Sequence, residues 1–206
     1  MTILASAHAG FGTGFTNPVL SSQSVFRCVM NALARPGSIQ TITEVAQAPA
    51  PLMPATAAVG LALFDHDTSI WIDERFATEP EIGAWLRFHT GAPLTRDASR
   101  AAFAVISSGT ALPGFDRFAL GEPEYPDRST TLIVQVDTMS EGQELVLSGP
   151  GIRGRSLLRA GALPPDFAPR MQANRALFPL GVDLLLVCGV QIVALPRSTH
   201  VAMKEA

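Results

Sequence analysis

Residues 178–200 read Phe178-Pro-Leu-Gly-Val-Asp-Leu-Leu-Leu-Val-Cys-Gly-Val-Gln-Ile-Val-Ala-Leu-Pro-Arg-Ser-Thr-His200. Two apolar runs, 182–187 and 190–195, flank the pair Cys188-Gly189. β-Rich runs of nearly continuous hydrophobicity are typical of strands covered on both faces. A short connection that contains glycine favours an antiparallel hairpin. The stretch therefore predicts a β-hairpin buried in the core.

The hairpin ends in a polar cluster. After Pro196 come Arg197, Ser198, Thr199 and His200. A guanidinium, two hydroxyls and an imidazole can hold an oxyanion, and the same residues can form a solvated strand end. If the segment stays extended, alternation puts Arg197 and Thr199 on one face and Ser198 and His200 on the other, which divides the cluster.

Asp183 places a carboxyl group inside the first apolar run. A buried carboxylate needs a partner, because an unpaired charge is costly to remove from water. Arg197, or Arg175 from the preceding segment, can supply that partner. We expect a structural ion pair here rather than a catalytic group.

The rest of the chain alternates helical and extended patterns. Helices are expected at 22–34, 55–63, 78–88 and 166–177, and strands at 38–43, 69–73, 102–107, 130–136 and from 144 to 147. Residues 109–127 show no clear element, so they are a natural place for function or partner contact. Interleaved helices and strands predict an α/β fold in three layers, with a mixed sheet between helices on both sides.

The helix expected at 22–34 has an apolar face. Its positions follow a spacing of three and four residues, at Val25, Phe26, Val29, Met30 and Leu33. This spacing predicts that one side of the helix packs on the core. Pro36-Gly37 should end the helix.

Length and composition predict a single domain over residues 1–206, since no linker divides the 206-residue chain. Apolar residues make up 47% and charged residues 16%, which argues against disorder. The low charge is compatible with a large core or with a surface that a partner covers. Residues 1–16 are rich in Ala, Gly, Ser and Thr and predict a flexible arm.

The charge and hydropathy patterns exclude several classes of protein. The net charge of −3 gives no field that favours nucleic acid. We see no apolar run of membrane-spanning length and no secretion signal, so no membrane contact and a cytoplasmic location are expected. Cys28 and Cys188 have no metal spacing and are expected as buried thiols. The four histidines show no metal pattern either, so no metal site is expected.

Lysine occurs once, at Lys204, against fourteen arginines. A pyridoxal phosphate enzyme needs a core lysine for its Schiff base, and Lys204 lies on a tail expected to fray. The chain is therefore expected to bind no pyridoxal phosphate, and we expect no other cofactor.

Residues 149–154 match the pattern Gly-x-Gly-x-x-Gly. A dinucleotide site also needs a helix that starts at the third glycine and an acidic residue about 20 positions further on. Residues 155–164 can form only a short helix at best. A glycine turn is the simpler interpretation, and a backbone nest with Arg153 or Arg155 against a phosphate is the alternative.

Residues 87–90, Arg-Phe-His-Thr, fall at the C-terminal end of an expected helix. The helix dipole favours a cation there, so Arg87 and His89 are candidates for contact with an anion or a partner. The alternative is a helix cap with a buried ring.

Five separated pieces, taken in order, resemble the PhnH family. They are Phe26-Arg27 with Ala34-Arg35-Pro36-Gly37; Arg87-Phe88-His89-Thr90 with Ala92-Pro93; Ser129-Thr130-Thr131-Leu132-Ile133; Leu147-Ser148-Gly149-Pro150-Gly151-Ile152; and the hairpin block. The pieces run from about residue 23 to 201, and none is a catalytic signature.

The resemblance implies a subunit of the carbon–phosphorus lyase core complex of phosphonate use. With PhnG, PhnI and PhnL, that family is associated with forming ribose 1-phosphonate 5-triphosphate from ATP and a phosphonate. PhnJ, the radical iron–sulfur enzyme, then breaks the C–P bond, and this chain lacks the cysteines of that subunit. The alternative is a non-catalytic scaffold that only organises the other subunits.

The resemblance also implies a homodimer within an assembly that contains PhnG, PhnI and PhnJ. It implies a fold similar to type I pyridoxal-phosphate-dependent transferases without the cofactor lysine. No self-contained active site is evident, so catalytic residues stay unassigned and it stays open whether this subunit is an enzyme. The candidate contacts for an anion or a partner are Arg87, His89, Arg153, Arg155, Arg197, Ser198, Thr199 and His200.

Overall fold

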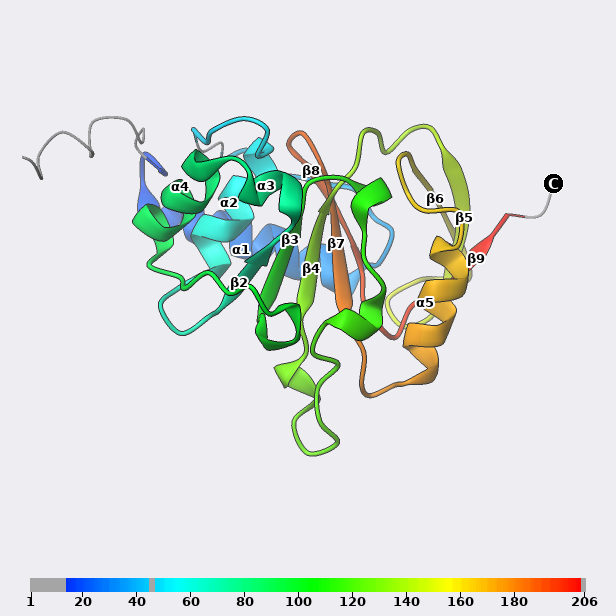
Figure 1. The fold of residues 1–206 in the computed structure, drawn as a ribbon. Helices are drawn as coiled ribbons and strands as arrows, with labels where there is room; N and C mark the ends of the chain where they lie inside the picture. The colour runs from blue at the N-terminus through cyan, green and yellow to red at the C-terminus, as the bar shows by residue number, and fades with distance from the viewer. Residues whose placement is uncertain (1–13, 45–46, 205–206) are drawn as a thin grey trace, which may run out of the picture.

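The computed structural model describes residues 14–44 and 47–204 and contains two β-sheets and five α-helices within them (Figure 1). The helices are α1 (Pro18–Ala34), α2 (Pro54–Leu63), α3 (Glu74–Ala77), α4 (Pro80–Thr90) and α5 (Phe167–Ala176). The strands are β1 (Gln40–Thr41), β2 (Ile70–Ile72), β3 (Phe103–Ile106), β4 (Thr131–Gln135), β5 (Gln143–Ser148), β6 (Ser156–Ala160), β7 (Asp183–Cys188), β8 (Gln191–Leu195) and β9 (His200–Met203). The region 109–127 holds short 3-10 turns and an isolated β-bridge from Leu120 to Ser129.

The six-stranded sheet has the order β1-β8-β7-β4-β3-β2. Strands β2, β3, β4 and β7 run parallel, whereas β8 and β1 are antiparallel to their neighbours. The predicted hairpin is confirmed as β7 and β8, and it lies inside the sheet between β4 and β1. The predicted α/β class and the mixed sheet are confirmed as well.

Side chains of the large sheet alternate between two hydrophobic cores. On β4 and β7, Ile133 and Leu185 face a core shared with α1, α2 and α4. Leu132 and Leu184 face the other core, which is shared with β5, β6, β9 and α5. All four are buried, and burying one such side chain stabilises a fold by about 1.5–3 kcal/mol. This two-sided burial explains the unbroken apolar runs in the sequence.

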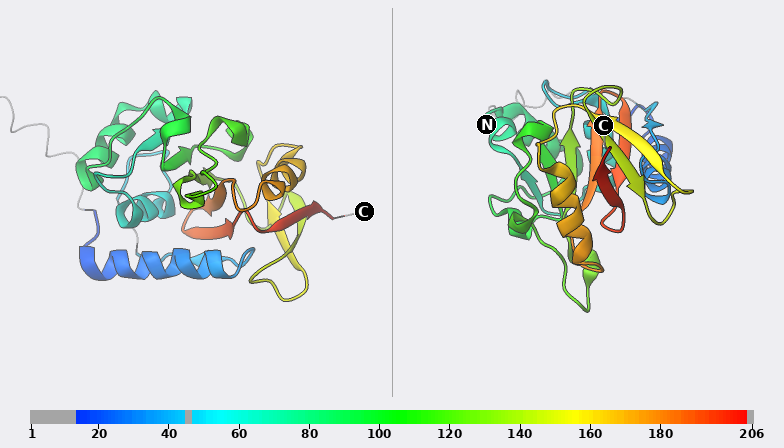
Figure 2. Two further views of the ribbon diagram at one scale, coloured as in Figure 1. Left: turned by 90° about the horizontal axis from the view of Figure 1, so that it is seen from below. Right: turned by 90° about the vertical axis from the view of Figure 1, so that its right-hand side faces the viewer.

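The second face of the large sheet differs from the expectation of helices on both sides. A smaller antiparallel sheet with the order β6-β5-β9 covers it, together with α5 (Figures 1 and 2). The short helix considered for 155–164 was wrong, because residues 156–160 form β6. Strand β9 was not expected at all.

The link between the two sheets is a turn after β8. The N–H of Thr199 donates to the carbonyl of Pro196 at 2.8 Å. The chain therefore does not stay extended after Pro196, as the alternation argument assumed. It turns and leaves the large sheet to enter the small one as β9.

Helix α1 is confirmed and begins earlier than expected, at Pro18, with Asn17 accepting from the N–H of Leu20. Its predicted apolar face is only partly correct. Val25 and Val29 are buried, but Phe26 and Met30 are about half exposed. A helix on the outside of a layer buries a single stripe, and these two side chains lie outside it.

The flexible arm was expected at residues 1–16, and its first thirteen residues lie outside the described part of the structure. Phe15 is buried in the core of α1, α2 and α4. The end of the expected arm is therefore packed. Helix α3 was also missed, because a single turn capped by the Asp73 side chain leaves no periodic pattern.

Candidate functional site

Arg197 makes the predicted structural ion pair with Asp183. Its Nη2 lies 2.5 Å from the carboxylate, and its backbone N–H donates to the same carboxylate at 2.7 Å. The guanidinium also donates to the carbonyls of Pro126 and Pro179, and to Ser129 Oγ. The side chain is 13% exposed. The donors of Arg197 are therefore occupied by acceptors of the protein itself, and its role is structural.

The side chains of residues 197–200 do not gather in one place, as the expected alternation along an extended strand also implied. The turn after Pro196 separates them instead. Thr199 is buried, Ser198 is half-buried and His200 begins β9. Arg197 points to the amino ends of β4 and β7, whereas His200 belongs to the small sheet. These residues do not converge on one ligand.

The outward side chains of the small sheet form three rows across β6, β5 and β9. The pairings Ser148↔His200 and Glu144↔Arg159 fix the register, and residues between the outward positions face the second core. The first row, which we call the basic row, is Arg155, Ser148 and His200; the second is Leu157, Val146 and Ala202; the third, which we call the ion-pair row, is Arg159, Glu144 and Lys204. Arg155 and Lys204 lie one residue beyond β6 and β9, and each is placed by continuing the register of its strand.

In the ion-pair row, one carboxylate joins two cations. Glu144 Oε2 accepts from Lys204 at 2.9 Å, and Glu144 Oε1 accepts from Arg159. The hydrogen bond from Lys204, and then that from Arg159, lower the pKa of Glu144 below its usual value. Lys204 was expected on a fraying tail, but this ion pair and its backbone bond to Glu144 hold it on the sheet.

The basic row has the same layout without a carboxylate. Its three side chains line a hollow of about 490 Å³, together with Val146, Ala202, Met203 and Lys204. Within residues 14–44 and 47–204, neither the Arg155 guanidinium nor the His200 imidazole makes a hydrogen bond or an ion pair. Arg153 is exposed on the turn that enters β6.

The glycine motif at 149–154 forms that turn, between β5 and β6. A strand follows the third glycine, so the helix that a dinucleotide site requires is missing there. Gly151 has a φ of +79°, and a Cβ there would lie 2.3 Å from the carbonyl oxygen of Ala34. Glycine is therefore required by the close approach of the turn to α1.

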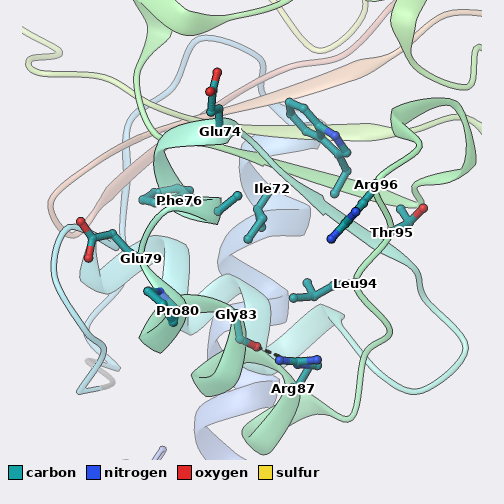
Figure 3. Close-up of a pocket in the computed structure, with 12 residues that line it drawn as sticks. Ile72, Glu74, Phe76, Glu79, Pro80, Gly83, Arg87, Leu94, Thr95 and Arg96 are labelled. Carbon is teal, nitrogen blue, oxygen red and sulfur yellow. Dashed lines mark hydrogen bonds between the residues drawn. The ribbon is translucent and has the colours of Figure 1, made fainter.

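A second cavity, which we call the Trp71 pocket, has a volume of about 670 Å³ and lies between β2, α3 and α4 (Figure 3). Arg87 reaches it, with its Nε donating to the carbonyl of Gly83 at 3.3 Å. Arg96 also lines the pocket, with Leu94 between it and Arg87, and Glu74 and Glu79 line other walls. The pocket carries both signs of charge, so its electrostatics do not select an anion.

His89 does not share the surroundings of Arg87. Its ring packs on Trp85, with centroids 4.5 Å apart, and it is half-buried. The helix ends at Gly91, whose N–H donates to the carbonyl of Arg87. This geometry favours packing at a helix end for His89, and its role as an anion or partner contact stays a prediction.

In the part of the chain that the structure describes, no group of cysteine, histidine or carboxylate side chains could hold a metal ion. Cys28 and Cys188 are free and half-buried rather than fully buried, and burial raises the pKa of both thiols. Among the described helices, none has the length and apolar character needed to cross a membrane.

The comparisons with known proteins agree over most of the chain. The family described as "Bacterial phosphonate metabolism protein (PhnH)" matches residues 13–202. The chain belongs to the PhnH family. The match includes both sheets and all five helices, so the fold above is that of the matched PhnH region.

Two relatives carry more specific names. The alpha-D-ribose 1-methylphosphonate 5-triphosphate synthase subunit PhnH of Rhizobium meliloti (strain 1021) is 43% identical over 199 residues, which cover 97% of this chain and 98% of the relative. The putative C-P lyase subunit protein HtxG of Stutzerimonas stutzeri is 39% identical over 87 residues, which cover 42% of this chain and 45% of that protein.

Arg155 and His200 were predicted from the sequence as candidate contacts, but the residues between and beside them were not. Ser148, Glu144 and Arg159 became part of the site only through strand pairing. A signal was available, because outward residues recur at every second position in Glu144-x-Val146-x-Ser148. The same two-residue period recurs in β9, at His200 and Ala202. It was not recognised because the turn before β9 separates these residues from the apolar run of β8.

Proposed function

We propose that this chain is the PhnH subunit of an α-D-ribose 1-methylphosphonate 5-triphosphate synthase, and that it serves bacterial phosphonate metabolism. The observation that carries the proposal is the 43% identity to the Rhizobium meliloti subunit over nearly the full length of both proteins. The partial match to a putative C-P lyase subunit points the same way. In this role the chain acts with PhnG, PhnI and PhnL on ATP and a phosphonate.

An exposed apolar stripe on α1 supports a role inside an assembly. Val19, Phe26 and Met30 follow a spacing of seven and four residues, which places them on one side of the helix. Their relative exposures are 79%, 49% and 48%. Apolar side chains gathered in this way are typical of surfaces that a partner covers.

We place the chain in a homodimer and in a cytoplasmic assembly with PhnG, PhnI and PhnJ. We also propose that the whole chain is one domain, related to type I pyridoxal-phosphate-dependent transferases but without their lysine. The second candidate function is a non-catalytic scaffold in the same assembly.

Co-expression tests the proposal directly. The tagged chain is produced with PhnG, PhnI and PhnJ from the same genome and analysed by affinity purification and size exclusion. We expect one complex of fixed composition that contains all four chains. If the tagged chain elutes alone from cells that contain the other three as soluble proteins, both the synthase subunit and the scaffold are refuted.

A further inference from the structure

We propose that the basic row, Arg155, Ser148 and His200, binds the tetrahedral oxyanion of a phosphonate or phosphate group. The proposal deepens the proposed function, on which it rests for the identity of the ligand. Its basis is the comparison of two rows on the same sheet face. The ion-pair row holds two cations and a carboxylate, while the basic row holds the same kind of donors around a neutral hydroxyl.

The ion-pair row shows how this sheet satisfies its cations. Arg159 and Lys204 flank the middle strand, and the carboxylate of Glu144 accepts two hydrogen bonds from Arg159 and one from Lys204. Two rungs away, Ser148 occupies the middle position between Arg155 and His200. The basic row therefore lacks only the negative group, and the hollow above Ser148 leaves space for one from outside.

The number of donors favours a phosphonate or phosphate group over a carboxylate. Neighbouring strands lie about 4.8 Å apart, so side chains from three adjacent strands can reach one small ligand. A guanidinium, a hydroxyl and an imidazole N–H offer at least three separate donors. A group with three terminal oxygens offers a separate oxygen to each of these side chains, whereas the carboxylate of Glu144 shares its two oxygens among three N–H donors. Arginine also suits bidentate contact with phosphate.

The local charge has the sign that such a ligand requires. The sheet face carries Arg155, Arg159 and Lys204 against the one carboxylate of Glu144, a net charge of +2, although the whole chain carries −3, and Arg153 on the adjoining turn adds a further positive charge. A face of opposite sign to the molecule concentrates anions near it. Val146 and Ala202 add apolar lining to the hollow, and a less polar surrounding strengthens contacts between charges.

The test measures binding of methylphosphonate and of inorganic tripolyphosphate to the purified full-length chain. Side-chain NMR signals of Arg155 and His200 report the site, and acetate at equal ionic strength is the carboxylate control. We expect saturable shifts with both phosphorus compounds and none with acetate. Equal shifts with acetate, or no shift with either phosphorus compound, would refute the oxyanion site.

Ser148→Glu is the decisive variant, because it places a carboxylate where the ligand is proposed to bind and so copies the ion-pair row. We expect binding to weaken at least about tenfold, the lower range for one charge-assisted contact, with an unchanged or raised unfolding temperature. Ser140→Glu makes the same charge change on an exposed loop and should bind like the wild type. Unchanged affinity in folded Ser148→Glu overturns the proposal.

A second variant keeps the test decisive if Ser148→Glu does not fold. Arg155→Ala removes an exposed side chain and should also weaken binding about tenfold; wild-type affinity in this variant refutes the site. The result is separable from the proposed function. Binding is measured on the chain alone, whereas subunit membership is measured by co-purification with PhnG, PhnI and PhnJ.

Discussion

Arg197 joins its own turn to two segments that are distant from it or from each other in sequence, 126–129 and 179–183. Its partners are the Asp183 carboxylate, the carbonyls of Pro126 and Pro179, and Ser129 Oγ. All of them lie near the amino ends of β4 and β7. A side chain with so many acceptors fixes the loops that enter the central strands.

Replacing Arg197 with Ala should therefore destabilise the fold. The change leaves Asp183, which is 24% exposed, without its cation, and breaking such a pair costs about 3 kcal/mol. Urea denaturation measures the loss. Arg128→Ala is the matched control, because its 3.9 Å pair with Glu122 is exposed and should cost less than about 1 kcal/mol. Equal losses in the two variants would contradict the structural role.

The pKa of Glu144 gives the ion-pair row a pH signature. Lys204 and Arg159 lower this pKa in the folded state, so the row stabilises the fold above the ordinary carboxyl pKa and loses its effect as pH falls through the lowered value. Glu144→Gln should thus lower the unfolding temperature at pH 7, and the difference from wild type should vanish in acid. A constant difference across this pH range would exclude the ion-pair explanation.

At the scale of elements, Asn174 connects α5 to β7. Its side-chain amide donates to the carbonyl of Val182 and accepts from the N–H of the same residue, both at 2.9 Å. The residue is 2% exposed. The contact sets the position where the chain leaves α5 and enters the central strand.

Asn174→Ala should cost about 2 kcal/mol, because it leaves a buried N–H and a buried carbonyl unsatisfied. Asn31→Ala on α1 removes an exposed amide and should change stability by less than about 0.5 kcal/mol. Thermal unfolding of the two variants under one buffer gives the comparison. A similar small loss in both would show that the α5–β7 contact is dispensable.

The elements that the sequence predicted well are those with a strong pattern. The hairpin of β7 and β8 was clear because both faces are buried, and Pro36-Gly37 marked the end of α1. Strands β6 and β9 were missed because each is short and half exposed, and because outward residues such as Arg155 and His200 look like loop residues. β6 follows β5 across the glycine turn, but β9 is distant from β5 in sequence, so only strand pairing reveals the row that they form.

The burial of Phe26 and Met30 was predicted wrongly for a related reason. Spacing identifies apolar positions on α1, but it does not say whether the core or a partner covers them. The ion pair of Asp183 and Arg197 could be predicted, since a carboxylate in an apolar run needs a cation nearby. The roles of Arg87 and His89 as contacts remain predictions.

At the scale of the whole molecule, the two faces of the large sheet carry different coverings. Helices α1, α2 and α4 cover one face, and α1 presents its exposed apolar stripe on the outside of that layer. The small sheet covers the other face and presents the rows of charged side chains. This division would let a subunit contact partners on one side and a phosphorus oxyanion on the other.

Reconstitution tests membership in the synthase most directly. PhnG, PhnI, PhnL and this chain are combined with ATP and methylphosphonate, and the release of adenine with formation of ribose 1-methylphosphonate 5-triphosphate is followed. The account predicts product only when this chain is present, and recovery when it is added back. Undiminished product without this chain would contradict the account.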